Sequence, residues 1–303
     1  MPREKKICLL FFGDYCSQDQ MSVWLENIPE LKVLNKIEPI FVFGKNTVEV
    51  MVGDWLRLAK IISDSAEKYD GFVVLHNIEN LLFSSAAISF LLPNFAKPIV
   101  FTGGLSPKAK DSGIKSNIIN ACQLAGHPLA EVCLLFGNKI LRANQASRNY
   151  SSSLNLFQAS SSGSLGQIDF SIRIFNQTKR DIENKVKMVS DLEENILIVE
   201  ATPILSIASL KDAIKNKKGL LVKADVNKIS SIVISALEEI SKKMPVVIFG
   251  KQQTDQLPDG FIVVSNMTLE ASIIKLMWSL KQVAAPTKIK DLMHKNVAGE
   301  III

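Results

Sequence analysis

Four of the five residues 76–80 are polar, and they combine an imidazole, a carboxylate and two carboxamides directly after the apolar residues 72–75. An apolar run that follows Asp70-Gly71 and stops at polar side chains is typical of a buried parallel strand. In an open α/β sheet, functional sites lie in the loops at the carboxyl ends of such strands. The loop that carries His76 and Glu79 is therefore the first candidate site of this chain.

The residues around this loop predict a β-α-β unit. Residues 81–92 have the length and composition of a helix, and its small side chains give it a slim face that can pack closely against a sheet: Ser84, Ser85, Ala86, Ala87 and Ser89. Residues 99–101 supply the next strand, which ends in Thr102 and a glycine pair. Residues 7–12 and 40–43 predict two further strands.

Residues 69–104 resemble type I, cytoplasmic-type L-asparaginases. The family's segment reads YDGFV-LHGTDTM, then a small-residue helix, then KP-V-TGSQ, and this chain retains YDGFVVLH and KPIVFTG. Residues 54–72, 266–282 and 292–301 match the family as well. The resemblance implies an asparaginase/glutaminase-like α/β fold, with a larger N-terminal doubly wound parallel-sheet domain and a smaller C-terminal α/β domain. It also implies a homodimer or tetramer and no metal or cofactor.

The family's attacking residues have been exchanged in this chain. The first strand of the family ends in Thr-Gly-Gly-Thr, whose first Thr is the nucleophile; the matching residue here is either Phe12 or Gly13, and neither can attack a carbonyl. At the second Thr position stands Ile78, which has no hydroxyl. The family's mobile lid is largely missing, and Tyr15 and Ser17 are the hydroxyls left near it, either as surface residues or as catalytic ones.

The charged residues of the family site have changed in a different way. Glu79 matches the family's Asp and keeps its charge, but its extra methylene moves the carboxylate by roughly an ångström. Residues 141–148 match the segment that ends in the family's Lys and place Arg148 there. Because arginine stays protonated, Arg148 can pair with Glu79 or with an anion but cannot serve as a base.

The resemblance thus gives two groups of candidate residues. Glu79, Arg148 and Tyr15 stand at or near catalytic positions, and Asn46, Thr47, Ile78 and Glu79 at substrate-binding positions. Thr47 matches a family Ser that binds the α-carboxylate of the substrate, although Asn46 and Thr47 are equally suited to cap a helix.

Composition, charge and cysteine spacing argue against several other function classes. The 303 residues are 47% hydrophobic and 21% charged, and the net charge of +5 is scattered without a basic stripe, so we expect no nucleic-acid binding. The four cysteines, Cys8, Cys16, Cys122 and Cys133, have neither zinc-site nor disulfide spacing. We find no apolar run of the ~18 residues that a membrane span needs and no signal-peptide pattern, and therefore expect a cytoplasmic protein without membrane attachment.

Two domains are expected from the order of the patterns. Residues 176–195 are polar and poor in large apolar side chains, and a second series of strands and helices begins at residue 196. We expect an N-terminal domain over residues 1–180, a linker over 181–195 and a C-terminal domain over 196–303.

Three function classes follow. The first is an asparaginase-family protein that has weak or no asparagine hydrolysis and binds a small amino acid or carboxylate, because losing several members of a catalytic set removes the activity of the whole set. The second is an active amidohydrolase that releases ammonia from L-asparagine with rewired residues, such as Ser147, Tyr15 or Thr47 as nucleophile. The third is a non-catalytic interaction protein, which a filled pocket would favour.

Overall fold

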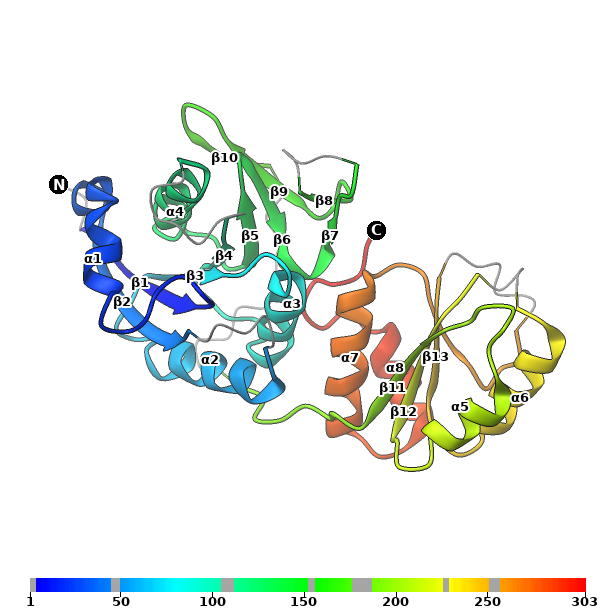
Figure 1. Cartoon of the computed structure of the whole chain (residues 1–303). Coiled ribbons are helices and arrows are strands. Elements are labelled where there is room, and N and C mark those ends of the chain that lie inside the picture. Colours follow the sequence, from blue (N-terminus) through cyan, green and yellow to red (C-terminus); the bar gives the residue numbers. More distant parts are fainter. Residues whose placement is uncertain are drawn as a thin grey trace. The chain divides into compact units, whose positions relative to one another are not determined.

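The chain forms two compact units. The computed structural model describes residues 4–44, 50–104, 112–151, 156–175, 187–225, 229–250 and 257–303. The first unit comprises residues 1–190 and 298–303, and the second comprises residues 191–297 (Figure 1). The division falls inside the expected linker, but residues 298–303, which we expected in the second domain, group with the first unit. None of the helices in the described residues is both long and apolar enough to cross a bilayer.

An eight-stranded sheet forms the centre of the first unit, in the order β10-β9-β6-β5-β4-β3-β1-β2. The parallel strands are β1 (Lys6–Phe12), β2 (Lys36–Phe43), β3 (Gly71–His76), β4 (Ile99–Thr102) and β5 (Val132–Phe136). Three antiparallel strands follow on one side: β6 (Lys139–Arg142), β9 (Ser164–Ile168) and β10 (Ile172–Ile174). A separate pair consists of β7 (Ala146–Arg148) and β8 (Phe157–Ala159). This arrangement confirms the predicted α/β class.

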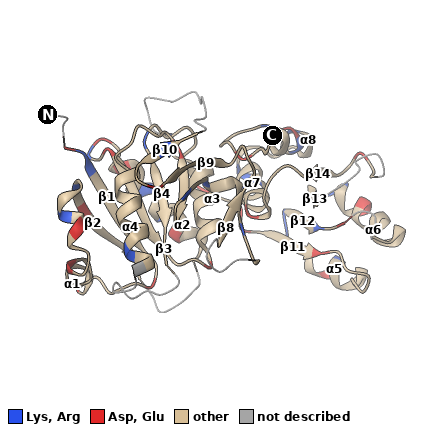
Figure 2. Cartoon of the chain, turned by 90° about the horizontal axis from the view of Figure 1, so that it is seen from above, with Lys and Arg blue, Asp and Glu red and all other residues tan. Residues whose placement is uncertain are grey.

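The helices of this unit are α1 (Met21–Glu26), α2 (Val52–Asp64), α3 (Leu81–Leu91) and α4 (Ser112–Leu124), with the 3-10 helices η1 (Pro29–Val33) and η2 (Ala143–Gln145). The slim helix is α3, and its serines and alanines between residues 84 and 89 are all buried, as predicted. Seen from above, segments with Lys or Arg and segments with Asp or Glu are scattered over the described residues, and no continuous basic stripe is visible in this view (Figure 2).

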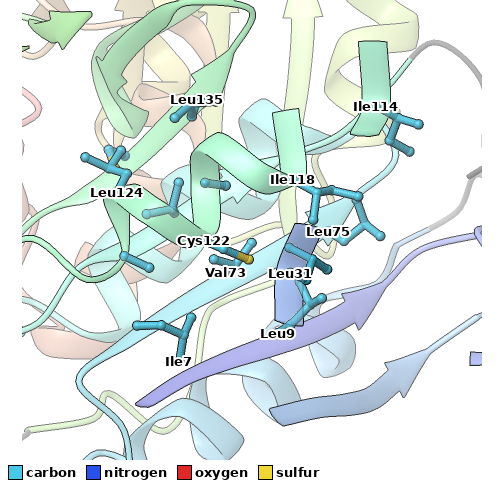
Figure 3. Packing of buried hydrophobic residues seen from close by; sticks show 14 of the residues in the cluster. Ile7, Leu9, Leu31, Val73, Leu75, Ile114, Ile118, Cys122, Leu124 and Leu135 are labelled. Carbon is cyan, nitrogen blue, oxygen red and sulfur yellow. The ribbon is translucent and has the colours of Figure 1, made fainter. Parts of the chain in front are cut away.

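The core on one face of the sheet lies between α4, η1 and the central strands. Ile7 and Leu9 of β1 and Val73 of β3 pack with Ile118 of α4, and Leu31 of η1 closes the same cluster (Figure 3). Because side chains alternate along a strand, the even-numbered residues of β1 face the opposite side. Both faces are buried, which explains why these strands read as continuous apolar runs.

Strand order also defines where a ligand crevice would lie. The chain passes from β1 to β2 on one side and then to β3 on the other side of β1. The crevice of an open α/β sheet lies at the carboxyl ends of the strands where this reversal occurs. In this protein, that point lies between the ends of β1 and β3.

The second unit has a four-stranded parallel sheet in the order β11-β12-β13-β14. Its strands are β11 (Ile196–Glu200), β12 (Gly219–Lys223), β13 (Val246–Phe249) and β14 (Ile262–Val264). Its helices are α5 (Ile207–Ala213), α6 (Ser231–Ser241), α7 (Leu269–Gln282) and α8 (Pro286–His294). The side chains of Ser206, Ser230 and Thr268 accept hydrogen bonds from the first turns of α5, α6 and α7, as helix caps do.

Residues 298–303 are held to the first unit by two amide side chains of η2. Asn144 Nδ2 donates to the Ala298 carbonyl at 2.8 Å. Gln145 Nε2 donates to the carbonyls of Gly299 at 2.8 Å and Ile301 at 2.9 Å. Both amides are buried, so these hydrogen bonds satisfy donors that have no access to water.

Deleting residues 298–303 should therefore destabilise the first unit. Each buried donor left without its acceptor costs about 1–3 kcal/mol. We expect a clearly lower midpoint for the first unit in differential scanning calorimetry. Removal of Ile302 and Ile303 alone is the matched control, because it leaves all three acceptor carbonyls in place. Equal midpoints for the two truncations would contradict this role of the tail.

Candidate functional site

The end of β1 is packed against the end of β3. Phe12 is fully buried, pairs in register with His76, and its ring centroid lies 5.1 Å from that of the imidazole. Gly13 follows with φ +152°, and a Cβ atom at this position would lie 2.5 Å from Asn77 Oδ1. The same oxygen accepts a hydrogen bond from the Asp14 backbone at 3.0 Å. Both candidate positions for the family nucleophile are thus occupied by closely packed atoms.

Tyr15 connects three strand ends. Its hydroxyl donates to the His76 carbonyl at 2.7 Å and accepts from the Gly104 backbone at 3.3 Å. Its ring is buried and packs edge-on against Trp24. Burial is the main reason why the pKa of Tyr15 is raised, and the charge of Glu79 raises it further. Tyr15 therefore stays a neutral hydroxyl whose proton is held by a carbonyl oxygen, which is unfavourable for a nucleophile.

A buried network of hydrogen bonds stabilises the loop that follows β3. His76 Nδ1 lies 2.6 Å from the Asn77 carbonyl oxygen, and Nε2 lies 2.7 Å from Ser84 Oγ. Because a carbonyl only accepts, we assign the proton to Nδ1, so that Nε2 accepts from the Ser84 hydroxyl. Ser84 Oγ in turn accepts from Trp55 Nε1 at 2.8 Å. Burial lowers the pKa of His76 to about 4, which keeps the imidazole neutral.

The predicted residues after β3 differ in exposure. Ile78 is buried, with 5% of its surface exposed, as an apolar filling residue should be. Glu79 is exposed and lies close enough to Tyr15 for its charge to affect that hydroxyl. The structure thus brings Tyr15, Ile78 and Glu79 to one place, at the carboxyl ends of β1 and β3.

Arg148 lies in a different environment from the one predicted. It is partly buried at the end of β7, with its guanidinium carbon 5.4 Å from the centre of the Phe157 ring on β8. Among the described residues, no ion pair joins Arg148 to Glu79, although the sequence suggested this partner. Asn46 and Thr47 lie outside the described residues. Ser147 Oγ donates to the Gln158 carbonyl at 3.5 Å.

Sequence reasoning missed three positioning contacts. Asn117 of α4 donates to the Gly103 carbonyl at 2.7 Å and accepts from the Gly137 backbone at 2.9 Å, so it joins the end of β4 to the β5–β6 turn. Arg142 and Glu131 form a buried ion pair at 3.2 Å. The third contact is the network of His76, Ser84 and Trp55. A polar residue in a mostly apolar segment was the available signal for Asn117 and Ser84. In the described part of the chain, no group of His, Cys, Asp and Glu residues is arranged to hold a metal ion.

Comparisons with known proteins agree with this architecture. Residues 13–180 match the family model described as Asparaginase, N-terminal. An L-asparaginase of Thermococcus kodakarensis is 24% identical over 88% of this chain and 86% of its own length. L-asparaginase 1 of Escherichia coli is 27% identical over 82% of this chain and 79% of its own length. The structure of L-asparaginase I from Vibrio cholerae is 21% identical, covers 99% of this chain and all (100%) of its own, and has a TM-score of 0.86.

Ser84→Ala tests the buried network. The substitution leaves Trp55 Nε1 and His76 Nε2 without a partner, so we expect unfolding to become easier by about 1–3 kcal/mol in a urea titration. Ser85→Ala is the matched control, since Ser85 is equally buried but its hydroxyl bonds only to Leu82 within the same helix. A loss of the same size in both variants would contradict the assigned network.

Stability should also depend on pH through His76. The folded-state pKa of about 4 lies below the ordinary value of 6.5, so the unfolded chain binds more protons between these values. The free energy of unfolding should fall as pH is lowered through this window, by at most about 1.4 kcal/mol per pH unit from this group. His76→Asn should remove this part of the slope, whereas His127→Asn, at an exposed histidine, should retain it. Urea titrations across the window measure the difference.

Proposed function

The chain belongs to the asparaginase family, and from this premise we propose that it is a family member in which asparagine hydrolysis is weak or lost. The observation that carries the proposal is the packing at the switch point of the sheet. Phe12 and Tyr15 are buried at the carboxyl ends of β1 and β3, and Ile78 is buried in the loop that follows β3. A substrate amide bound there would have to displace side chains that are packed to the density of a core.

The chemistry of these side chains supports the same proposal. Phe12, Gly13 and Ile78 offer no hydroxyl at the positions where the resemblance expects threonines. The Tyr15 hydroxyl donates its proton in a hydrogen bond to the His76 carbonyl, and its pKa is raised. Arg148 cannot accept a proton. Amide hydrolysis needs a nucleophile and a base that share a proton, and the described residues of this crevice supply neither in a suitable arrangement.

Binding of a small amino acid or carboxylate is the second candidate function. It is favoured by the exposed carboxylate of Glu79 and by the permanent charge of Arg148, which forms a cation–π contact with Phe157. A carboxylate ligand could accept a bidentate hydrogen bond from this guanidinium.

Two other functions remain as outcomes of the tests. An active amidohydrolase would need Ser147, Thr47 or Tyr15 as nucleophile, and a non-catalytic interaction protein would respond to no small ligand.

We further propose a homodimer or tetramer located in the cytoplasm, as the resemblance suggests, without a metal or cofactor. Light scattering after gel filtration tests the assembly, for which a monomer would be the contrary result.

Ammonia release tests the leading proposal. Purified protein at high concentration should release no more ammonia from L-asparagine or L-glutamine than a protein-free blank. The reason is that the missing members of the catalytic set act together. Asparagine-dependent release that disappears in Ser147→Ala, Thr47→Ala or Tyr15→Phe would establish the rewired amidohydrolase instead.

Thermal shift tests the second candidate. L-aspartate or a dicarboxylate should raise the unfolding temperature, because a ligand that binds only the folded state stabilises it. Arg148→Ala should remove the shift, and Arg57→Ala, which removes an exposed guanidinium from α2, should keep it. A shift that is unchanged in Arg148→Ala would exclude this residue from the binding site.

A further inference from the structure

We propose that the first unit carries a second ligand site, at the amino ends of β1 and β2, for a zwitterion with an apolar side chain. The ligand class is an α-amino acid with a large apolar side chain or a short peptide of such residues. A cavity of about 570 Å³ lies here between α1, η1 and the beginning of β2. This volume is within the range of small-molecule sites.

The floor of the cavity is apolar and belongs to the packed core. Ile28 and Leu31 line it and are buried members of the core cluster, in which Leu31 lies beside Leu9 (Figure 3). Leu25 and Ile37 also line it and pack against the same cluster. An apolar ligand group placed on this floor would bury its surface without requiring the core to open.

The walls are held by contacts to α4. Glu30 of η1 forms an ion pair with Lys115 of α4 at 2.8 Å. Asn35, which lines the cavity just before β2, donates to the Cys122 carbonyl at 3.3 Å. The segment between α1 and β2 is thus fixed to the core at two points, which reduces the entropy lost when a ligand binds.

The rim carries charges of both signs. Glu4, Glu26, Lys32 and Lys36 line the cavity, and these four side chains form no ion pair with one another in the described structure. Figure 2 shows acidic and basic ribbon segments together around α1 and β2. A ligand with one ammonium and one carboxylate group complements such a rim, whereas a purely anionic or cationic ligand would meet a like charge.

The adjoining sheet edge argues against an added β-strand as the occupant. The Lys36 backbone donates to Lys5, so Lys36, Glu38 and Ile40 direct their backbone groups toward β1. Pro39 therefore faces the open edge and has no N–H to donate, and it lines the cavity. A peptide strand could not form a continuous ladder past this residue, which favours a small ligand.

This site is separate from the candidate site described above. Glu4 and Lys36 stand at the amino ends of β1 and β2, whereas Tyr15 and Glu79 lie at the carboxyl ends of β1 and β3. The inference therefore holds whether or not the protein hydrolyses asparagine.

Calorimetric titration of the full chain tests the proposal. L-phenylalanine and leucyl-leucine are the probes for the free amino acid and the short peptide. We expect saturable binding of at least one of them. N-acetyl-L-phenylalanine, which lacks the ammonium group, and L-phenylalaninamide, which lacks the carboxylate, should bind at least about tenfold more weakly than L-phenylalanine, or at least about 1.4 kcal/mol less favourably. Equal affinity for the zwitterion and its blocked forms would overturn the assignment.

Substitutions of residues that line the cavity test where the ligand binds. Lys36→Glu and Glu26→Lys should each lower the affinity for the zwitterion about tenfold or more, and Ser22→Trp should block the cavity. Lys60→Glu, at an exposed lysine that pairs with Asp64 on α2, is the control and should not change affinity. Circular dichroism checks that each variant is folded. The proposal would be overturned if neither probe bound at millimolar concentration, or if binding survived all three cavity variants. Binding lost only in Arg148→Ala would belong to the other site and would also overturn it.

Discussion

The hydrogen bond from the Tyr15 hydroxyl to the His76 carbonyl closes the switch point of the main sheet. It joins the end of β1 to the end of β3, and the bond that Tyr15 accepts from Gly104 adds β4 to the same point. Below it, the neutral imidazole of His76 is fixed by Ser84 and Asn77. The strand ends therefore have one well-defined arrangement, in which Phe12 and Ile78 are buried and Glu79 is exposed to water.

Under the function proposed above, the family fold and the exchanged site residues have different physical origins. The fold depends on the apolar residues of β1, β3 and α4, which are buried on both sides of the sheet. Exchanging a hydroxyl for an apolar side chain at a strand end adds to this burial and removes a polar group that would need a partner. Under the function proposed above, the fold of the family is thus kept, or even stabilised, while the groups that move protons are lost.

Much of the fold was readable from the sequence, because strands buried on two faces and a helix of small residues leave strong patterns. The strand predicted over residues 40–43 begins after Pro39, whereas β2 begins at Lys36 and contains this proline. On an edge strand, however, a proline that faces outward costs no ladder hydrogen bond. The site was less accessible. Sequence positions put Tyr15 and Glu79 in the loops that follow two predicted strands, but they do not give side-chain directions. The contact of Arg148 with the Phe157 ring and the partners of His76 were therefore not predicted.

The return of residues 298–303 to the first unit has a consequence for biosynthesis. The second unit, residues 191–297, is inserted in the chain before the segment that binds Asn144 and Gln145. On the ribosome, residues 1–190 of the larger unit emerge first, but the unit cannot form all its hydrogen bonds until residues 298–303 have been made as well. Its maturation has to wait for the smaller unit to be translated, because the hydrogen bonds to Ala298 and Gly299 can form only then.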